Sequence, residues 1–349
     1  MNITFLIGNG FDLNCGLKSS YHDIYLEYIK QPSSSDVIAK FKKDLWDKID
    51  NWGDFEVAMA DYMKNFKTEN DFLECLRDFV AYLEKYLTDE EKQYTDISSD
   101  RIRSVIIKEL NKSLTEFHKG VTHDLDRLHV QDANIFAVVF NYTKVFDTFQ
   151  GLESSINTPV TIKDVIHIHG RLNDDVIMGM DNASQIKDLQ FSLSMKGRRA
   201  FIKSVMNQYY DTIRLNNAIK YISNSDVICV FGMSLGESDL RWRNLIIDTL
   251  VKKDNAHLFL YDHKCSCLSS MGAEHRIDVE EERKKEKLNA WHIKENDMSL
   301  VFDKVHIPCC KNIFNFSDVI TKEKLMIIAE ERALKEKAPR FVYPTNLNR

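Results

Sequence analysis

The sequence has no excess of positive charge. Its 349 residues include 47 Lys and Arg against 53 Asp and Glu, which gives a formal net charge of −6. A protein whose main partner is nucleic acid usually carries a basic excess, so such a partner is not expected. No apolar run approaches the ~20 residues that a membrane-spanning helix needs, and the stretch from Met1 to Ile7 has neither a basic leader nor an apolar core of export length. We therefore expect a cytoplasmic protein without a membrane partner.

The sequence also lacks cysteines at metal-binding spacing. Its seven cysteines are scattered, and the close groups are Cys265 with Cys267 and Cys309 with Cys310. Neither group has the two-residue gap of a zinc knuckle. Reduced thiols in a reducing compartment are the simplest interpretation, and no metal site is predicted. Internal repeats and low-complexity tracts are absent too, while 44% hydrophobic and 29% charged residues are typical of a folded globular protein.

What the chain does contain is a series of short apolar runs without polar alternation, which suits strands buried on both faces of a parallel sheet. The runs are Ile3–Ile7, Ile135–Phe140, Val165–Ile168, Val176–Met180, Val227–Phe231, Leu258–Tyr261 and, more weakly, Val305–Ile307. Helical patterns separate several of them, among them a single helix expected over Gly197–Ile222. This alternation predicts an α/β fold of the Rossmann-like, doubly wound kind with a mostly parallel sheet.

The stretch between the first and second runs is patterned almost wholly as helix. Apolar residues recur there at three- and four-residue intervals, over Asp36–Asp50, Asp54–Phe66, Asp71–Leu87 and Arg101–Leu128. Ser35 or Asp36 could cap the first of these helices, and Thr68 or Asn70 the third. We therefore predict a core formed by residues 1–18 and 132–310, a helical insertion over 19–131, and a C-terminal helix and tail over 311–349. The insertion could carry a surface for self-assembly or for a partner.

The first chemical motif follows the strand Ile3–Ile7 and contains Gly8, Asn9, Gly10 and Asp12. A strand that enters a glycine turn and then a helix presents backbone N–H groups to an anion, and glycine lets a phosphate approach closely. The spacing is not that of the full dinucleotide fingerprint, so a purely structural tight turn is the alternative. Asp12 would repel a phosphate unless its carboxylate binds ribose hydroxyls, a helix N–H or a metal.

Two further motifs end later strands. Asn141 follows the run Ile135–Phe140 at the carboxyl edge of the sheet, where ligands of open α/β sheets bind, although it could equally cap a following helix. His167 and His169 lie two residues apart, so in a strand both rings would point to the same face. Two titratable rings on an otherwise apolar strand indicate a functional pair, and histidine is suited to proton transfer at neutral pH.

A second strand–glycine turn follows Val227–Phe231 and contains Gly232, Ser234 and Asp239. The Ser234 hydroxyl could reach a phosphate or a ribose. Glu237 or Asp239 could stabilise the first turn of the next helix through its dipole. A structural strand-to-helix turn with a good cap explains the same residues.

Together these motifs resemble the AbiH family of bacterial abortive-infection (anti-phage) proteins. The resemblance rests on IGNGFDLNCGLKSSY, FNYT, HIHG with the following Met178 to Asp181, GMSLGESD, and the WGDFE segment that begins at Trp52. It extends from residue 3 to about residue 250 and implies a defence function. The same order is more distantly similar to the sirtuin-like NAD-binding fold. That similarity implies that Asn141 and His169 occupy the Asn and His positions of NAD-hydrolysing relatives.

Three functions are consistent with these patterns. The first is cleavage of the nicotinamide–ribose bond of NAD or a related nucleotide, with His169 and Asn141 catalytic and with Gly8, Asn9, Gly10, Asp12, His167, Gly232, Ser234 and Asp239 holding the nucleotide. The second is a nucleotide-sensing or interaction module without turnover. The third is metal-dependent phosphoryl chemistry with Asp12, Asp181 and Asp239 converging on magnesium.

Overall fold

A six-stranded, all-parallel open sheet forms the centre of the protein. The structure is a computed structural model, and it describes residues 1–49, 52–96, 133–149, 162–210, 212–262 and 273–308 with isolated positions at 112, 314, 321–323, 326, 327 and 330. The strands are β1 (Asn2–Ile7), β2 (Asn134–Val139), β3 (Ile162–His167), β4 (Val227–Phe231), β5 (His257–Tyr261) and β6 (Val305–His306). Their spatial order, β3-β2-β1-β4-β5-β6, is that of the Rossmann fold. The predicted fold class is confirmed.

The strands end level with one another at a single edge of the sheet. Ile7 of β1 is in register with Val139 of β2 and with Phe231 of β4, and Val139 is in register with His167. The segments that follow these residues must therefore leave the sheet side by side. The strand order reverses between β1 and β4, which is the switch point where open α/β sheets bind ligands.

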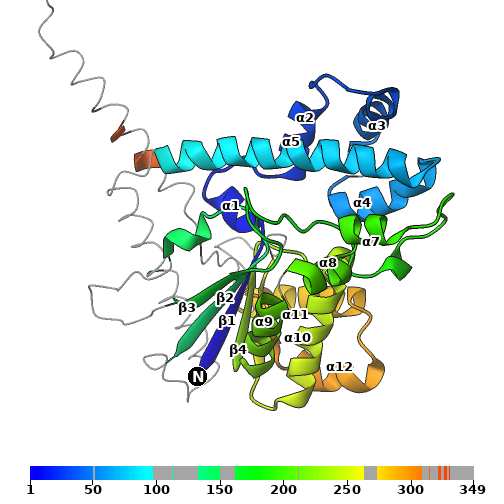
Figure 1. The fold of residues 1–349 in the computed structure, drawn as a ribbon. Helices are drawn as coiled ribbons and strands as arrows, with labels where there is room; N and C mark the ends of the chain where they lie inside the picture. Colours follow the sequence, from blue (N-terminus) through cyan, green and yellow to red (C-terminus); the bar gives the residue numbers. More distant parts are fainter. Residues whose placement is uncertain are drawn as a thin grey trace, which may run out of the picture.

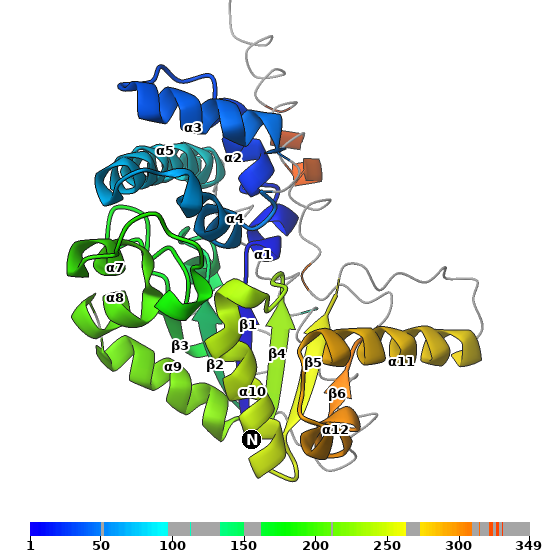
Figure 2. The same cartoon turned by 90° about the vertical axis from the view of Figure 1, so that its right-hand side faces the viewer.

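Helices cover the sheet and its carboxyl edge (Figures 1 and 2). Their bounds are α1 (Gly10–Asn14), α2 (Tyr21–Tyr28), α3 (Asp36–Asp47), α4 (Phe55–Tyr62), α5 (Glu69–Asp96), α7 (Met195–Phe201), α8 (Lys203–Tyr210), α9 (Thr212–Asn224), α10 (Leu240–Lys252), α11 (Ala273–Ala290) and α12 (Glu295–Phe302), with short 3-10 turns at η4 (Phe146–Phe149) and η6 (Glu237–Asp239). Helices α9 and α10 pack against one face through an apolar core that includes Ile222 and Trp242. Phe11, Phe146 and Phe314 lie against the other face.

The helices α2, α3, α4 and α5 form a layer above the carboxyl edge of the strands, as Figures 1 and 2 show; we call it the helical layer. Its aromatic core, in which Phe55 stacks on Phe79 with 4.0 Å between ring centroids, is continuous with residues outside the layer such as Tyr142 and Phe201. The Ser35 hydroxyl accepts a hydrogen bond from Ile38 N, and Thr68 Oγ1 accepts one from Asp71 N, so both predicted caps are confirmed. The predicted domain boundaries stay a prediction.

Two sequence-based predictions were wrong. Val176–Met180 is not a strand; Met180 makes an isolated bridge to Ile202, and the nearby Gly179 has a φ of +141°. The helical pattern over Gly197–Ile222 corresponds to three helices, α7, α8 and α9, and Ile202 is extended between α7 and α8. The predicted helices at Arg101–Leu128 and in the C-terminal segment lie largely outside the described residues. Among the residues described, no helix is both long and apolar enough to cross a membrane.

Candidate active site

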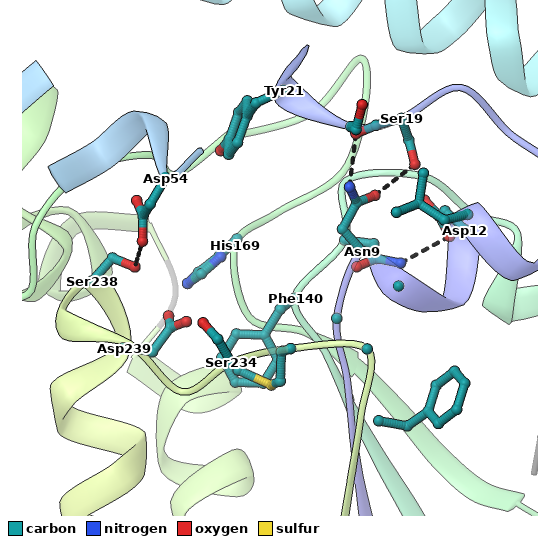
Figure 3. A pocket seen from close by; sticks show the side chains of 18 of the residues that line it. Asn9, Asp12, Ser19, Tyr21, Asp54, Phe140, His169, Ser234, Ser238 and Asp239 are labelled. Carbon is teal, nitrogen blue, oxygen red and sulfur yellow. Dashed lines mark hydrogen bonds between the residues drawn. The ribbon is translucent and has the colours of Figure 1, made fainter. Parts of the chain in front are cut away.

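A cavity of about 1090 Å³ lies between the carboxyl edge of the sheet and the helical layer (Figure 3). Every loop that leaves the carboxyl ends of β1, β2, β3, β4 and β5 contributes to its wall, as do α2, α4 and α5. Of the ten residues predicted to form the site, nine line the cavity: Gly8, Asn9, Gly10, Asp12, Asn141, His169, Gly232, Ser234 and Asp239. Segments far apart in the sequence thus meet around one space.

The glycines pack two turns against each other. Gly10 N donates to Gly232 O at 2.8 Å, and Gly8 N donates to Phe231 O at 2.9 Å. A Cβ on Gly10 would lie 2.5 Å from Gly232 Cα, and Gly232 itself has a φ of +73°. Phe11 N also donates a hydrogen bond, to Gly8 O. The amides of Gly8, Gly10 and Phe11 are therefore committed within the fold, and the close approach that requires glycine is between the β1 and β4 turns.

Asn9 anchors the loop that follows α1. Its Nδ2 donates to Ser19 O at 2.7 Å, while the Ser19 hydroxyl donates to Asn9 Oδ1 at 2.6 Å. Figure 3 shows both bonds at the rim of the cavity. Since both polar atoms of the Asn9 amide are bonded to Ser19, the side chain supports the wall and the route into α2.

Asp12, Asn141 and Thr143 form a buried group at the start of α1 and after β2. Asn141 Nδ2 donates to Asp12 Oδ1 at 2.8 Å, and Thr143 Oγ1 donates to Asp12 Oδ2 at 2.6 Å. Burial raises the pKa of Asp12 to about 6, against the lowering effect of these two hydrogen bonds. Asn141 Oδ1 is buried and has no hydrogen-bond partner among the described residues.

His169 lies in the wall of the cavity, in contact with aromatic rings. In Figure 3 its ring lies between Tyr21 and the pair formed by Ser234 and Asp239. The residue is 6% exposed, and its Nε2 is buried without a partner within the described part of the chain. Burial, reinforced by the charge of Lys203, lowers the pKa of His169 well below its usual value, while a hydrogen bond to the Phe140 backbone opposes the shift. The ring is therefore neutral at pH 7.

His167 is the exception among the predicted site residues, because it is not among the residues that line the cavity. Its Nε2 lies 2.6 Å from Asp147 Oδ1, and its Nδ1 lies 3.1 Å from Asn141 O. Asp147 also pairs with Arg171. The two rings diverge because β3 ends at His167 and the chain then turns at Gly170, whose φ is +78°. Both ring nitrogens of His167 serve the wall behind Asn141.

Lys203 joins the helical layer to the core. Its Nζ lies 3.4 Å from Glu56 Oε1, 3.5 Å from Asp239 Oδ1 and 3.1 Å from Ser238 O. Burial raises the pKa of Glu56 to about 7 despite the opposing charge of Lys203, and it raises the pKa of Asp239 as well. The same carboxylates raise the pKa of Lys203 against its own burial, so the ammonium keeps its charge.

The carboxylates that could bind magnesium do not converge. Asp12 and Asp239 line the cavity, but Asp181 instead accepts a hydrogen bond from Arg241 N at 2.7 Å. Within the described residues, no group of three or more His, Cys, Asp or Glu side chains is arranged to hold a metal ion.

Sequence reasoning missed several residues of the cavity wall. Those with polar side chains are Asn14, Ser19, Ser20, Tyr21, Asp54, Glu56, Tyr142, Thr143, Lys203, Ser238, Tyr261, Asp262 and Lys287. Some of them belong to motifs that the sequence analysis identified, as Asp54 and Glu56 belong to the WGDFE segment. Asp54 caps α4 by accepting a hydrogen bond from Val57 N, and it accepts another from Ser238 Oγ at 2.9 Å. Tyr21 ends the IGNGFDLNCGLKSSY motif, whereas Lys203 lies outside every motif and only long-range packing brings it to the cavity.

The strand order, the level strand ends and the cavity at the switch point define a Rossmann-like α/β protein with a ligand site at its sheet edge. Comparison with protein families matches residues 4–261 to "Bacteriophage abortive infection AbiH". The chain belongs to this family, and membership implies a function in abortive infection of bacteriophage. A search of curated proteins found no match to the chain.

Proposed function

We propose that this protein hydrolyses the N-glycosidic bond between ribose and nicotinamide in NAD or a related nucleotide, and that this activity drives abortive infection. One observation carries the proposal. Asn141 Oδ1 and His169 Nε2 are both buried, line the same cavity and lack a hydrogen-bond partner among the described residues. Buried polar atoms are rarely left unpaired, so orphaned atoms in a cavity favour a bound ligand.

Both orphaned atoms call for hydrogen-bond donors. An amide oxygen can only accept, and a neutral His169 that is bonded to the Phe140 backbone through its other ring nitrogen offers Nε2 as an acceptor. A ribose hydroxyl, a carboxamide NH2 group and a water molecule all supply such donors. Because the pKa of His169 is lowered, its Nε2 can take a proton from a water or a ribose hydroxyl at neutral pH.

The charge of the wall supports the same bond. Cleavage of an N-glycosidic bond develops positive charge on the ribose, and the nicotinamide ring of NAD is itself cationic. Five carboxyl side chains line the cavity, namely Asp12, Asp54, Glu56, Asp239 and Asp262, against the two ammonium groups of Lys203 and Lys287. Lys203 is paired with Glu56 and Asp239, and Asp262 is paired with Arg283 at 2.7 Å and with Lys287 at 3.4 Å, which leaves Asp12 and Asp54 without a cation among the cavity residues. The remaining negative potential would favour a cationic ring and a cationic transition state.

The nucleotide would occupy the cavity in a definite direction. We place the nicotinamide ribose between Asn141 and His169 and the adenosine half toward Ser234, Tyr261 and Lys287, which form the wall beside β4 and β5. The pyrophosphate would pass beside the glycine turns, which line the cavity. Because the amides of Gly8 and Gly10 are used within the fold, its hydrogen bonds would come from other groups.

The test is release of nicotinamide from NAD by the purified protein, with and without EDTA. His169→Ala and Asn141→Ala should each lower the rate by about 10²–10⁴-fold, the usual contribution of a placed proton acceptor. His22→Ala is the matched control, because His22 is an exposed histidine of α2. EDTA should change nothing. Normal turnover by His169→Ala would eliminate this mechanism, and stabilisation by NAD without any product would favour a nucleotide sensor.

A further inference from the structure

Asp12 lines the cavity, but its carboxyl is buried and both of its oxygens are hydrogen-bonded to neighbouring residues. Asp12 is 1% exposed, Asn141 5% and Thr143 1%. One oxygen of Asp12 accepts from Asn141 Nδ2, and the other accepts from the Thr143 hydroxyl. Figure 3 shows Asp12 at the start of α1, among the residues that line the cavity. Both carboxyl oxygens of Asp12 are therefore hydrogen-bonded to protein groups, and one of these groups is the Asn141 amide.

The chemistry of this pair fixes which way the Asn141 amide points. A carboxylate can only accept hydrogen bonds, so the amide must turn its NH2 group toward Asp12. Its carbonyl oxygen, Oδ1, then has no partner among the described residues and is left for the cavity. A rotation of the amide by 180° would set two acceptors against each other in a buried place, which is costly.

We propose that Asp12 is a positioning residue, whose ionised carboxylate orients the Asn141 amide so that Oδ1 accepts a donor group of the ligand. That the ligand is a nucleotide rests on the function proposed above; the orientation of the amide does not. The role assigned to Asp12 is therefore to orient Asn141, and not to contact a phosphate directly.

The orientation depends on the protonation of Asp12. A protonated carboxyl can donate to Asn141 Oδ1, so the amide gains a second orientation in which its NH2 group faces the cavity. Burial raises the pKa of Asp12 to about 6. The other charged groups that act on it are Glu91 of α5, which raises the pKa, and His167 of β3, which lowers it; the Thr143 hydroxyl also lowers it. The change in the orientation of the Asn141 amide is therefore expected near pH 6.

The experiment is nuclear magnetic resonance on the full chain with ¹⁵N-labelled asparagine, and the Asn141 side-chain signals are assigned by their loss in Asn141→Asp. We expect these signals to shift with a midpoint near pH 6. Asp12→Asn should abolish the transition. Thr143→Val removes a bond that lowers the pKa of Asp12 and should move the midpoint to higher pH, and Thr143→Ser should restore it. Asn141 signals that do not change between pH 5 and pH 8 would overturn the proposal.

Turnover gives a separate readout. If NAD is the substrate, nicotinamide release by the wild type should fall below about pH 6, and the residual activity of Asp12→Asn should lack this acid limb. A displaced catalytic group typically costs about 10²-fold in rate, which is the loss expected for Asp12→Asn at pH 8. A wild type that releases no nicotinamide refutes the proposed function but leaves the resonance test of Asp12 intact. Should Asp12→Asn not fold, the upward shift of the midpoint in Thr143→Val and the restored midpoint in Thr143→Ser still decide the matter.

Discussion

The ammonium of Lys203 lies 3.4 Å from the carboxyl of Glu56, and this buried pair joins α8 of the core to α4 of the helical layer. Removing the cation would leave the buried Glu56 and the partly buried Asp239 without compensation. We expect Lys203→Met to lower the free energy of unfolding by about 3–5 kcal/mol, and Lys203→Met with Glu56→Gln to recover part of that loss. The control is Lys252→Met, because Lys252 and Asp248 form an exposed pair worth less than about 1 kcal/mol. Urea unfolding measures all three, and equal losses for Lys203→Met and Lys252→Met would contradict this account.

The two histidines of the HIHG motif should separate by function. His167→Ala removes the buried contacts with Asp147 and the Asn141 carbonyl, so we expect a loss of about 1–3 kcal/mol in unfolding free energy. His169→Ala removes a ring whose Nε2 has no partner among the described residues, so the loss should be smaller, while nicotinamide release is lost. Denaturation curves and turnover of both variants give the comparison. A His169→Ala protein that is the less stable of the two but fully active would reverse the assignment.

The glycine turns should be intolerant of a single methyl group. A Cβ on Gly10 would lie 2.5 Å from the Gly232 backbone, which neither turn can relieve without moving the other. Gly10→Ala should therefore cost at least the ~1–3 kcal/mol typical of overpacking. Gly53→Ala is the matched control, because a Cβ at Gly53 meets nothing within 4 Å, and its effect should stay within about 0.5 kcal/mol. Thermal unfolding of the two variants distinguishes backbone packing from a general preference for glycine.

Binding of a cationic ligand should strengthen as pH rises. The pKa values of Asp12 and Glu56 are raised to about 6 and about 7, so both carboxyls ionise as pH rises from 5 to 8 and make the cavity more negative. Carba-NAD, a non-hydrolysable analogue with a cationic ring, should bind more tightly over this range. The affinity should rise by about tenfold for each unit by which the bound ligand lowers the pKa of a cavity carboxyl. NADH, whose ring is neutral, should show a weaker dependence. Calorimetric titration at several pH values gives both curves, and identical pH dependence for the two ligands would speak against a cation-selective wall.

The same raised pKa values bear on the stability of the ligand-free protein. A carboxyl whose pKa is higher in the folded than in the unfolded state binds more protons when folded, so its contribution to stability falls as pH rises. For Asp12 and Glu56 this loss extends from about pH 4 to about pH 7. Thermal midpoints measured with and without carba-NAD should therefore diverge as pH rises, since the ligand compensates the charge that ionisation creates. Midpoints that stay parallel across this range would argue against the coupling.

Sequence patterns were sufficient for the sheet and for the general position of the site. Uninterrupted apolar runs such as Val227–Phe231 indicate strands that are covered on both faces of the sheet. Parallel strands bring their carboxyl ends to one edge. Asn141 and Ser234 therefore could be placed at a common edge without coordinates. The run Val176–Met180 misled because its apolar residues pack against the helical layer and not into the sheet.

The remaining parts of the site depend on contacts that no local pattern encodes. Lys203 follows a helix and reaches the cavity only because Ile202 breaks the chain direction between α7 and α8. His167 and His169 were expected on the same face because side chains two residues apart point the same way in a strand. This rule does not extend to His169, because β3 ends at His167. The glycines were predicted to admit a phosphate, whereas their backbone is used to pack two turns together. Spacing indicates which residues leave the sheet edge, and packing decides which of them face the cavity.

The central claim is that His169 acts on a nucleotide in this cavity and that this action produces abortive infection. The most direct measurement is intracellular NAD and nicotinamide, by mass spectrometry, in phage-infected bacteria that produce the wild type, His169→Ala or His22→Ala. We predict that NAD falls and nicotinamide rises with the wild type and His22→Ala, and that His169→Ala abolishes both the change and the protection against phage. Protection by the wild type at constant NAD, or full protection by His169→Ala, would contradict the account.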